Sequence, residues 1–189
     1  TAMQTPLSPL QAFMAAPLRS KALAVLAGLC AALLLAVIGL RMLAEQGGTN
    51  SFALVADSFL NLRPYVTACF DVDCAVRDGR TYVVFPPLPG VIAMPLVALF
   101  GLNTAGFTAI GFAAFLGSLW LWKRIFDKLE VEAPVVAWLL LAIAFASPLF
   151  YVTLRAEKVW FFAQALAFLF VAAALHEALA RRVLNAGIA

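Results

Sequence analysis

The sequence predicts an all-α, polytopic membrane protein with about four transmembrane helices, and its composition carries that prediction. Hydrophobic residues make up 65% of the 189 residues and charged residues only 12%. Soluble domains average roughly 45–50% apolar and about 25% charged residues, so a chain this apolar needs lipid as its solvent. Its apolar residues form long unbroken runs without alternation, which favours helices over a β-barrel. The net charge of +3 is too small to indicate a nucleic-acid partner.

Four segments are predicted to cross the membrane, and the first shows why. Ala22–Leu40 is uncharged and rich in Leu, Ala and Val, with Lys21 and Arg41 at its two ends. At about 1.5 Å per residue this run is roughly 28 Å long, close to the thickness of the hydrocarbon core. The predicted spans are 21–43, 104–122, 133–152 and 159–180.

The uncharged stretch Thr81–Trp122 admits two interpretations. It is either a hairpin of two full spans, or a short interfacial helix over 86–102 followed by one span. Prolines interrupt its first part, and the apolar run that remains, Val91–Leu102, has a length more typical of interfacial or re-entrant segments. The second interpretation also gathers the basic residues after Trp122 on the side of the N-terminus, which satisfies the positive-inside rule. We therefore expect four spans and a cytoplasmic N-terminus.

This topology divides the rest of the chain into loops and tails. A long extracytoplasmic loop over 44–103 holds two short helices, and a second extracytoplasmic loop is much shorter. The short helices are expected at about 51–62 and 86–102, the second extracytoplasmic loop at 153–158, the cytoplasmic loop at 123–132, and the tails at 1–20 and 181–189.

Asp57 is the first candidate functional residue. Apolar residues recur at roughly helical spacing through Ser51–Leu62, which predicts a short amphipathic helix with Asp57 inside it. The carboxylate is either a solvated surface group or a functional one, since acidic groups beside apolar segments are often functional. Both interpretations stay open on the pattern alone.

Two cysteines and two aspartates lie close together in the first outer loop. Cys69 and Cys74 are either joined by a disulfide, if the loop faces an oxidising compartment, or free thiols. Two cysteines without a nearby histidine do not complete a zinc site. Asp71 and Asp73 have the spacing of an Asp-x-Asp metal pair, which is a weak signal. We assign no metal site and leave an assisting divalent metal open.

The second outer loop places Glu157 between the basic residues Arg155 and Lys158. The cluster is either a rim of weak surface ion pairs or an acid beside an anion-binding group. Asp57 and Glu157 lie on the same side of the membrane only in the four-span topology. The topology is therefore itself a test of any site that uses both acids.

Several runs resemble, in order and spacing, the N-terminal part of bacterial glycosyltransferases of the C superfamily, more narrowly the protein O-mannosyltransferase-like and aminoarabinose-transferase-like group. The runs are Leu54–Leu60, Asp78–Gly90, Pro95–Gly101, Ser147–Arg155 and Val159–Phe170, within a resemblance that covers about residues 20–189. Members of that family are longer and have many more spans. The resemblance therefore implies that this chain is an N-terminal fragment or a truncated product.

The resemblance also implies roles for individual residues. Asp57 matches the family's acid that acts as general base or orients the acceptor, and Glu157 matches its second acid. Pro86 and Pro87 resemble the His-Pro-Pro-Leu motif of protein mannosyltransferases, with Phe85 in place of the histidine, and with Tyr82 they form a structural motif. The basic residues expected to contact the donor phosphate are Arg155, Lys158, Arg63 and Arg80.

The implied reaction is transfer of a sugar from a polyprenyl-phosphate-linked donor to an extracytoplasmic acceptor with inversion. The implied partners are membrane lipid, the lipid-linked sugar, and either the missing C-terminal part or another membrane subunit. The implied location is the bacterial inner membrane, with the active face extracytoplasmic. The alternative is a non-enzymatic membrane subunit or scaffold of a larger complex, which would be indifferent to changes at Asp57 and Glu157.

Overall fold

The computed structural model describes residues 18–70, 73–180 and 187. The chain divides into two units, one up to Val37 and one from Ile38 onward, and each is described by itself. The described residues are mostly helical, as predicted. Three helices are long and apolar enough to cross a membrane, namely α2 (Leu18–Ala44), α5 (Phe107–Lys128) and α8 (Val159–Leu179).

The span predicted over 133–152 is not one continuous helix. It consists of α6 (Ala133–Leu141), the π-helical segment η1 (Ala142–Ala146) and α7 (Pro148–Leu154), with a bend of 50° between η1 and α7. Pro148 has no N–H to give to the preceding turn, and its ring clashes with the carbonyl four residues back. Ser147 compensates, because its hydroxyl donates to the Ile143 carbonyl at 2.6 Å and accepts from Leu149 N–H at 3.1 Å. Counting the bent pair as one span gives four.

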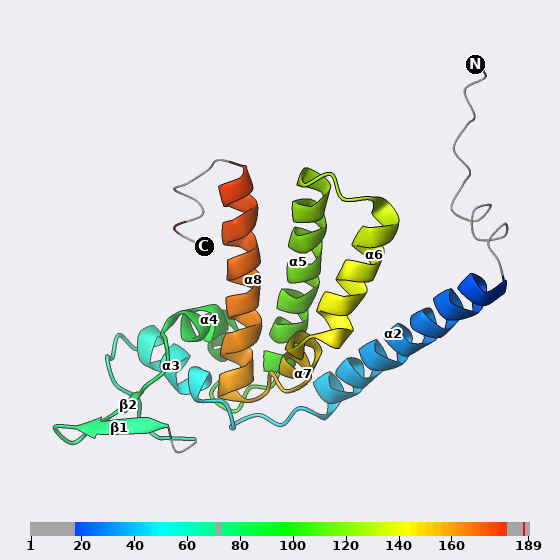
Figure 1. The fold of residues 1–189 in the computed structure, drawn as a ribbon. Coiled ribbons are helices and arrows are strands. Elements are labelled where there is room, and N and C mark those ends of the chain that lie inside the picture. Colours follow the sequence, from blue (N-terminus) through cyan, green and yellow to red (C-terminus); the bar gives the residue numbers. More distant parts are fainter. Residues whose placement is uncertain (1–17, 71–72, 181–186, 188–189) are drawn as a thin grey trace. The chain divides into compact units, whose positions relative to one another are not determined.

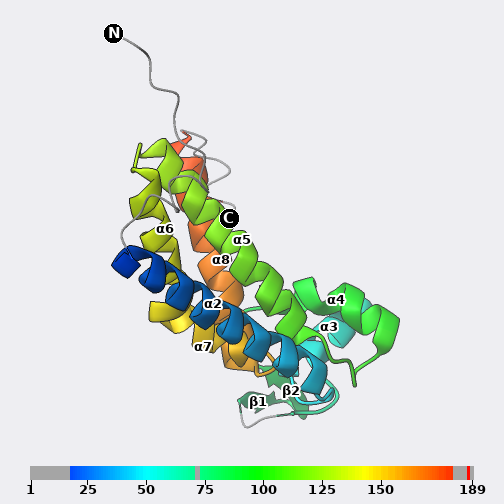
Figure 2. The same cartoon turned by 90° about the vertical axis from the view of Figure 1, so that its right-hand side faces the viewer.

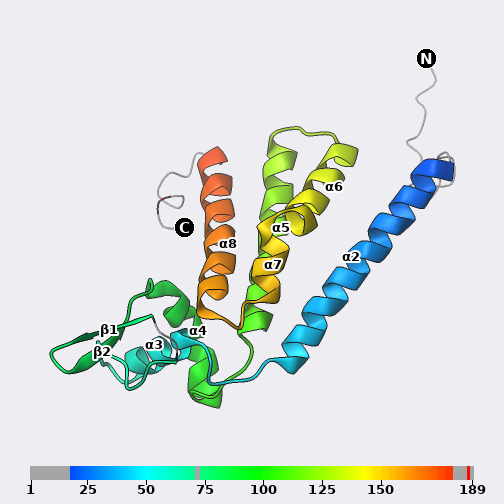
Figure 3. The same cartoon turned by 60° about the horizontal axis from the view of Figure 1, so that its bottom comes forward.

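Helices α5 and α8 run side by side, with α6 next to α5 (Figures 1 and 3). Small residues bring α5 and α8 close together. A Cβ built on Gly111 would lie 2.5 Å from Ala156 Cβ, and one built on Gly117 would lie 3.1 Å from a Leu169 methyl carbon. Gly111 therefore allows the loop before α8 to approach α5 closely, and Gly117 does the same for α8 itself.

The first outer loop folds against the N-terminal ends of α5 and α8 (Figures 1 and 2). Its helices α3 (Ser51–Leu60) and α4 (Leu88–Phe100) are each slightly shorter than predicted. They pack so closely that a Cβ on Gly90 would lie 2.4 Å from a Val55 methyl carbon.

The short helix predicted here is present as α3, but its buried residues are not confined to one face. Most of its residues are buried, because α4 covers the face that would otherwise meet water. The helix ends at Leu60, and Leu62 beyond it is 94% exposed with a φ of 53°. The buried residues of α3 are Ser51, Phe52, Ala53, Leu54, Val55, Ala56 and Ser58.

A β-hairpin in the same loop was not predicted. Strands β1 (Cys74–Arg77) and β2 (Arg80–Val83) pair in antiparallel register across Asp78 and Gly79. Both turn residues have positive φ, 52° and 72°, as a two-residue type I′ turn requires. Asp-Gly is a strong local signal for such a turn. The high apolar content of the flanking sequence concealed it.

Candidate functional site

A polar pocket of about 280 Å³ lies where α2 ends and α8 begins. It belongs entirely to the unit that starts at Ile38. Four of its lining residues carry charges, two acidic and two basic, which is unusual for a chain of this composition. Its lining residues are Arg41, Ala44, Glu45, Gln46, Thr49, Glu157 and Lys158.

Glu157 is the carboxylate with a free oxygen in this pocket. Its Oε1 lies 3.1 Å from Arg41 Nη2 and 3.3 Å from Arg155 Nε, and the side chain is 14% exposed. Its Oε2 is buried and has no hydrogen-bond partner among the described residues. Ionised carboxylate oxygens each accept about two hydrogen bonds, so Oε2 has unused capacity to accept one from a hydroxyl.

The loop that carries Glu157 is fixed from two directions. Ala156 is fully buried and lies against Gly111 of α5. Asn50 donates from Nδ2 to the Glu157 carbonyl at 3.2 Å, and its Oδ1 accepts from Phe52 N–H at 3.0 Å, which caps α3. The start of α3 therefore holds the backbone of the short outer loop.

Glu45 is a second acid of the pocket, and the sequence analysis missed it. Its Oε1 accepts from the N–H groups of Gly106 at 3.0 Å and Phe107 at 2.9 Å, and its Oε2 accepts from Thr108 N–H at 2.9 Å. The carboxylate thus caps the positive end of α5. The only sequence signal was indirect: Gly106, the residue before α5, has no side chain that could cap the helix.

The charges of the lining balance, and Arg155, which pairs with Glu157 from outside the lining, adds a third basic residue beside the pocket. Glu157 is shared by Arg41 and Arg155, and the charge of Glu45 is compensated by the start of α5. Among the described residues, the Lys158 ammonium has no hydrogen bond or ion pair. Lys158 is also the N-cap of α8, whose first N–H groups add positive potential beside it. The arrangement suits an anionic group such as a phosphate.

Asp57 lies outside this pocket. Its Oδ2 is bound by Arg63 Nη2 at 2.6 Å and its Oδ1 by Asn61 Nδ2 at 3.0 Å. Seven residues of helix separate it from Asn50, which is about 10 Å along the helix axis. The structure therefore groups Asp57 with Arg63, and Glu157 with Arg155 and Lys158, but it does not join the two acids in one cluster.

The other predicted residues lie around the hairpin. The Arg80 guanidinium stacks on the Tyr65 ring at 4.9 Å and does not line the polar pocket. Tyr82 and Pro87 line a cavity of about 210 Å³ beneath α3. Pro86 instead lines a larger, apolar groove.

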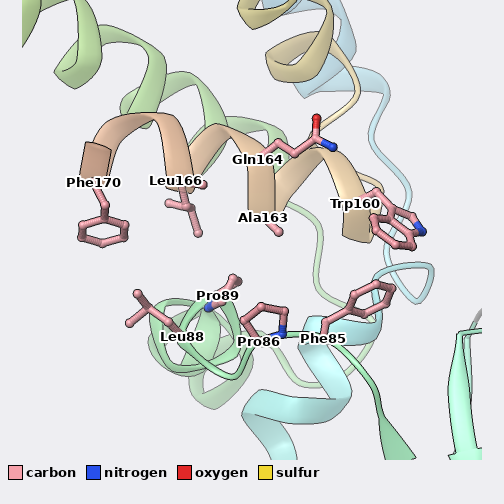
Figure 4. A pocket seen from close by; sticks show the side chains of 10 residues that line it. Phe85, Pro86, Leu88, Pro89, Trp160, Ala163, Gln164, Leu166 and Phe170 are labelled. Atoms are coloured by element: carbon pink, nitrogen blue, oxygen red, sulfur yellow. The ribbon is translucent and has the colours of Figure 1, made fainter. Parts of the chain in front are cut away.

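This apolar groove, of about 350 Å³, runs between α4 and α8 (Figure 4). At one end Trp160 meets Phe85 edge to face, with ring centroids 4.8 Å apart. The groove and the polar pocket share no lining residue, but the start of α8 contributes to both, since Lys158 lines the pocket and Trp160 lines the groove. Nothing in the sequence indicated that α4 would form the opposite wall. The lining residues are Phe85, Pro86, Leu88, Pro89, Trp160, Ala163, Gln164, Leu166, Ala167 and Phe170.

The cysteine pair and Asp73 lie next to the same end of the groove. Cys69 and Cys74 form a disulfide, with their Cα atoms 6.3 Å apart. Asp73 Oδ2 accepts a hydrogen bond from Trp160 Nε1 at 2.9 Å. Asp71, the other half of the Asp-x-Asp pattern, lies outside the described residues. Among the residues that are described, no three His, Cys, Asp or Glu side chains gather in a metal-binding group.

Comparison of the chain with protein-family models, with curated proteins and with solved structures gives no match. Function is therefore argued from the site itself.

Proposed function

We propose that the chain is the N-terminal module of a membrane glycosyltransferase, which transfers a sugar from a polyprenyl-phosphate-linked donor to an extracytoplasmic acceptor with inversion. One observation carries the proposal: the first residues of α8 line two different sites, since Lys158 lines a charged pocket and Trp160 lines an apolar groove. An amphiphile with an anionic head and an apolar tail matches both parts. The inference that the transferred group is a sugar rests on the resemblance of the sequence to the glycosyltransferase family.

In this proposal the groove holds the part of the polyprenyl chain nearest the phosphate. Its volume is at the lower end of small-ligand pockets, roughly 300–1,000 Å³, so the remainder of a long chain lies in the bilayer. Lys158 contacts the phosphate, because its ammonium is the cation without a partner among the described residues. Arg155 and Arg41 add positive potential while they hold Glu157.

Glu157 acts as the general base in this scheme. Its Oε2 takes the proton of the acceptor hydroxyl as the hydroxyl oxygen attacks the anomeric carbon. The bond between that carbon and the phosphate oxygen breaks, and the polyprenyl phosphate leaves with its negative charge next to Lys158. A single displacement of this kind inverts the anomeric centre.

Asp57 has a different role from the one the resemblance implies. Both of its oxygens are engaged by Asn61 and Arg63, and it does not line the polar pocket. We assign it the task of holding the end of α3 and the turn that follows. Arg63 and Arg80 are then not donor-phosphate ligands.

Binding of undecaprenyl phosphate to the full chain in lipid nanodiscs tests this proposal. We expect saturable binding that Lys158→Met weakens about tenfold, since one charge-assisted contact to phosphate contributes roughly 1.5–3 kcal/mol. Lys123→Met is the matched control, because Lys123 lies near the opposite end of α5 and pairs with Asp127. Undecaprenol, which lacks the phosphate, should bind the wild type and Lys158→Met equally.

Two results would overturn the proposal. One is the absence of saturable binding of undecaprenyl phosphate to the wild-type chain. The other is equal affinity of the wild type and Lys158→Met. Either result, together with co-purification of a second membrane protein, would favour the alternative of a non-enzymatic subunit.

A further inference from the structure

A side-chain hydrogen bond joins the loop before the hairpin to α8: Trp160 Nε1–H donates to Asp73. We propose that Asp73 is a positioning residue, which holds Trp160 as the wall of the groove next to the head group and so makes Trp160 a specificity-determining residue for the lipid chain. This inference deepens the proposed function and rests on it, because it takes the groove to hold the chain of a lipid phosphate.

Trp160 is 54% exposed, and two contacts hold its ring. Its ring packs edge to face on Phe85, and Phe85 in turn contacts the fully buried Phe52 of α3 at a centroid distance of 5.9 Å. Its Nε1–H donates to Asp73 at 2.9 Å. An indole ring with both contacts has one orientation, whereas the ring packing alone leaves it free to slide and tilt on Phe85. The hydrogen bond therefore sets the width of this end of the groove.

Asp73 is itself restrained by the disulfide. It immediately precedes Cys74, whose bond to Cys69 closes a short loop, and Cys74 begins β1. A carboxylate on an unrestrained loop would lose conformational entropy each time it met Trp160. The disulfide and the hairpin remove most of that cost before the contact forms. The Cys69–Cys74 disulfide therefore helps to position Trp160 at the groove.

The expected consequence is selectivity for the segment of chain next to the phosphate. Isoprene units are methyl-branched and wider than a saturated alkyl chain. A groove end of fixed width distinguishes the two, and a loose one adapts to both. We therefore expect the dissociation constant for hexadecyl phosphate divided by that for undecaprenyl phosphate to exceed one in the wild type and to fall toward one when Trp160 is released.

The test compares Asp73→Leu, which removes the acceptor, with Asp73→Asn, which keeps an acceptor oxygen at the same place. Two readouts are taken in nanodiscs: the ratio of dissociation constants, and acrylamide quenching of Trp160 after the other three tryptophans, Trp120, Trp122 and Trp138, are changed to Phe. Asp73→Leu should reduce the ratio roughly two- to tenfold, the range expected for one net hydrogen bond, and raise the quenching. Asp73→Asn should leave both near wild type.

Further variants distinguish loss of the Asp73–Trp160 hydrogen bond from a general loss of structure. Trp160→Phe keeps a ring against Phe85 but removes the N–H, so it should lower the ratio as Asp73→Leu does. The double variant Asp73→Leu/Trp160→Phe should lower it no further, since the two residues act through one bond. Cys69→Ser/Cys74→Ser should reproduce the quenching of Asp73→Leu.

The inference is overturned if Asp73→Leu leaves the ratio unchanged, or if Asp73→Asn is as defective as Asp73→Leu. It is also overturned if Trp160 quenching is the same in all variants. Failure of the proposed function has a different signature, namely no saturable binding of undecaprenyl phosphate to the wild-type chain. In that case the inference about chain selectivity is also wrong.

Discussion

Asp57 and Glu157 each pair with arginine, and the two carboxylates differ in what they leave unsatisfied. The Asp57 carboxylate is closed: each of its oxygens has a partner, although Arg63 Nε is buried without one among the described residues, and the Asp57 and Arg63 side chains are 23% and 28% exposed. The Glu157 cluster is open: two guanidiniums share one oxygen, and the other oxygen is buried without a partner among the described residues. Sequence treated both acids as equal candidates.

The comparison shows that the capacity of an ion pair to bind a substrate depends on two things. One is whether one of its carboxylate oxygens lacks a partner, and the other is whether a pocket lies beside it. A closed pair can neither accept a proton from a substrate nor bind one more ligand without first breaking. An open pair beside a pocket can do both.

The first prediction concerns the side of the membrane that each loop faces, and its outcome is all or none. We expect Leu62→Cys to react with a membrane-impermeant maleimide in intact cells, and Leu129→Cys to react only after permeabilisation. Both positions are accessible, with 94% and 55% of the residue exposed. The background should lack Cys30, Cys69 and Cys74. Labelling of both positions from one side would place the loop after α5 next to the outer loop and remove the four-span topology.

Glu157→Gln should have the largest effect on chemistry. The amide keeps the shape but cannot take a proton, and a general base typically contributes roughly 10²- to 10⁴-fold to the rate. We expect release of polyprenyl phosphate from a polyprenyl-phosphate mannose donor to fall by at least about 100-fold, with donor affinity within about threefold of wild type. A variant that retains half of the wild-type rate would end the assignment of Glu157 as base.

Glu45→Gln should reduce stability. The amide oxygen can accept from some of the three N–H groups at the start of α5, but it carries no charge to meet the helix dipole. We expect a loss of about 1–2 kcal/mol, within the range for a lost helix cap, seen as a lower midpoint of thermal unfolding in detergent. Glu132→Gln is the control, since Glu132 precedes α6 without a capping hydrogen bond. Equal midpoints for the two variants would contradict the capping role.

Asp57→Asn should have the smallest effect. The pair with Arg63 is partly exposed, so its removal should cost about 1 kcal/mol or less, and binding of undecaprenyl phosphate should stay within about twofold of wild type. Thermal unfolding and the nanodisc binding assay measure the two quantities. A loss of activity in Asp57→Asn comparable to that of Glu157→Gln, with folding intact, would restore Asp57 to the site and break the contrast.

Much of the architecture could be predicted because it depends on apolar length alone. The spans at 104–122 and 159–180 correspond to α5 and α8, and the short helix at 86–102 corresponds to α4. The break at Pro148 was not predicted, because the span over 133–152 was assigned from its lack of charge alone. The burial of α3 could not be seen, because a helix that is apolar almost all round looks like an interfacial one until a second helix covers it.

The candidate site was predictable only in part, and for a physical reason. Glu157, Arg155 and Lys158 are neighbours in sequence, so their grouping needed no tertiary structure. Glu45 lies 61 residues from the first N–H that it caps. Such a contact depends on how helices meet, and no local pattern records it. The position of Phe85 in the wall of the groove also depends on tertiary packing, so it could not be predicted from the sequence.

The long-range cap of α5 also bears on how the protein is made. Glu45 leaves the ribosome before Gly106, so the carboxylate that completes the start of α5 is already present when that helix enters the bilayer. A helix whose first N–H groups lack a partner is costly in or near lipid. The order of synthesis therefore supplies the partner in time, and a chain assembled from α2 and α5 made as separate pieces should insert α5 poorly unless the α2 piece is made first.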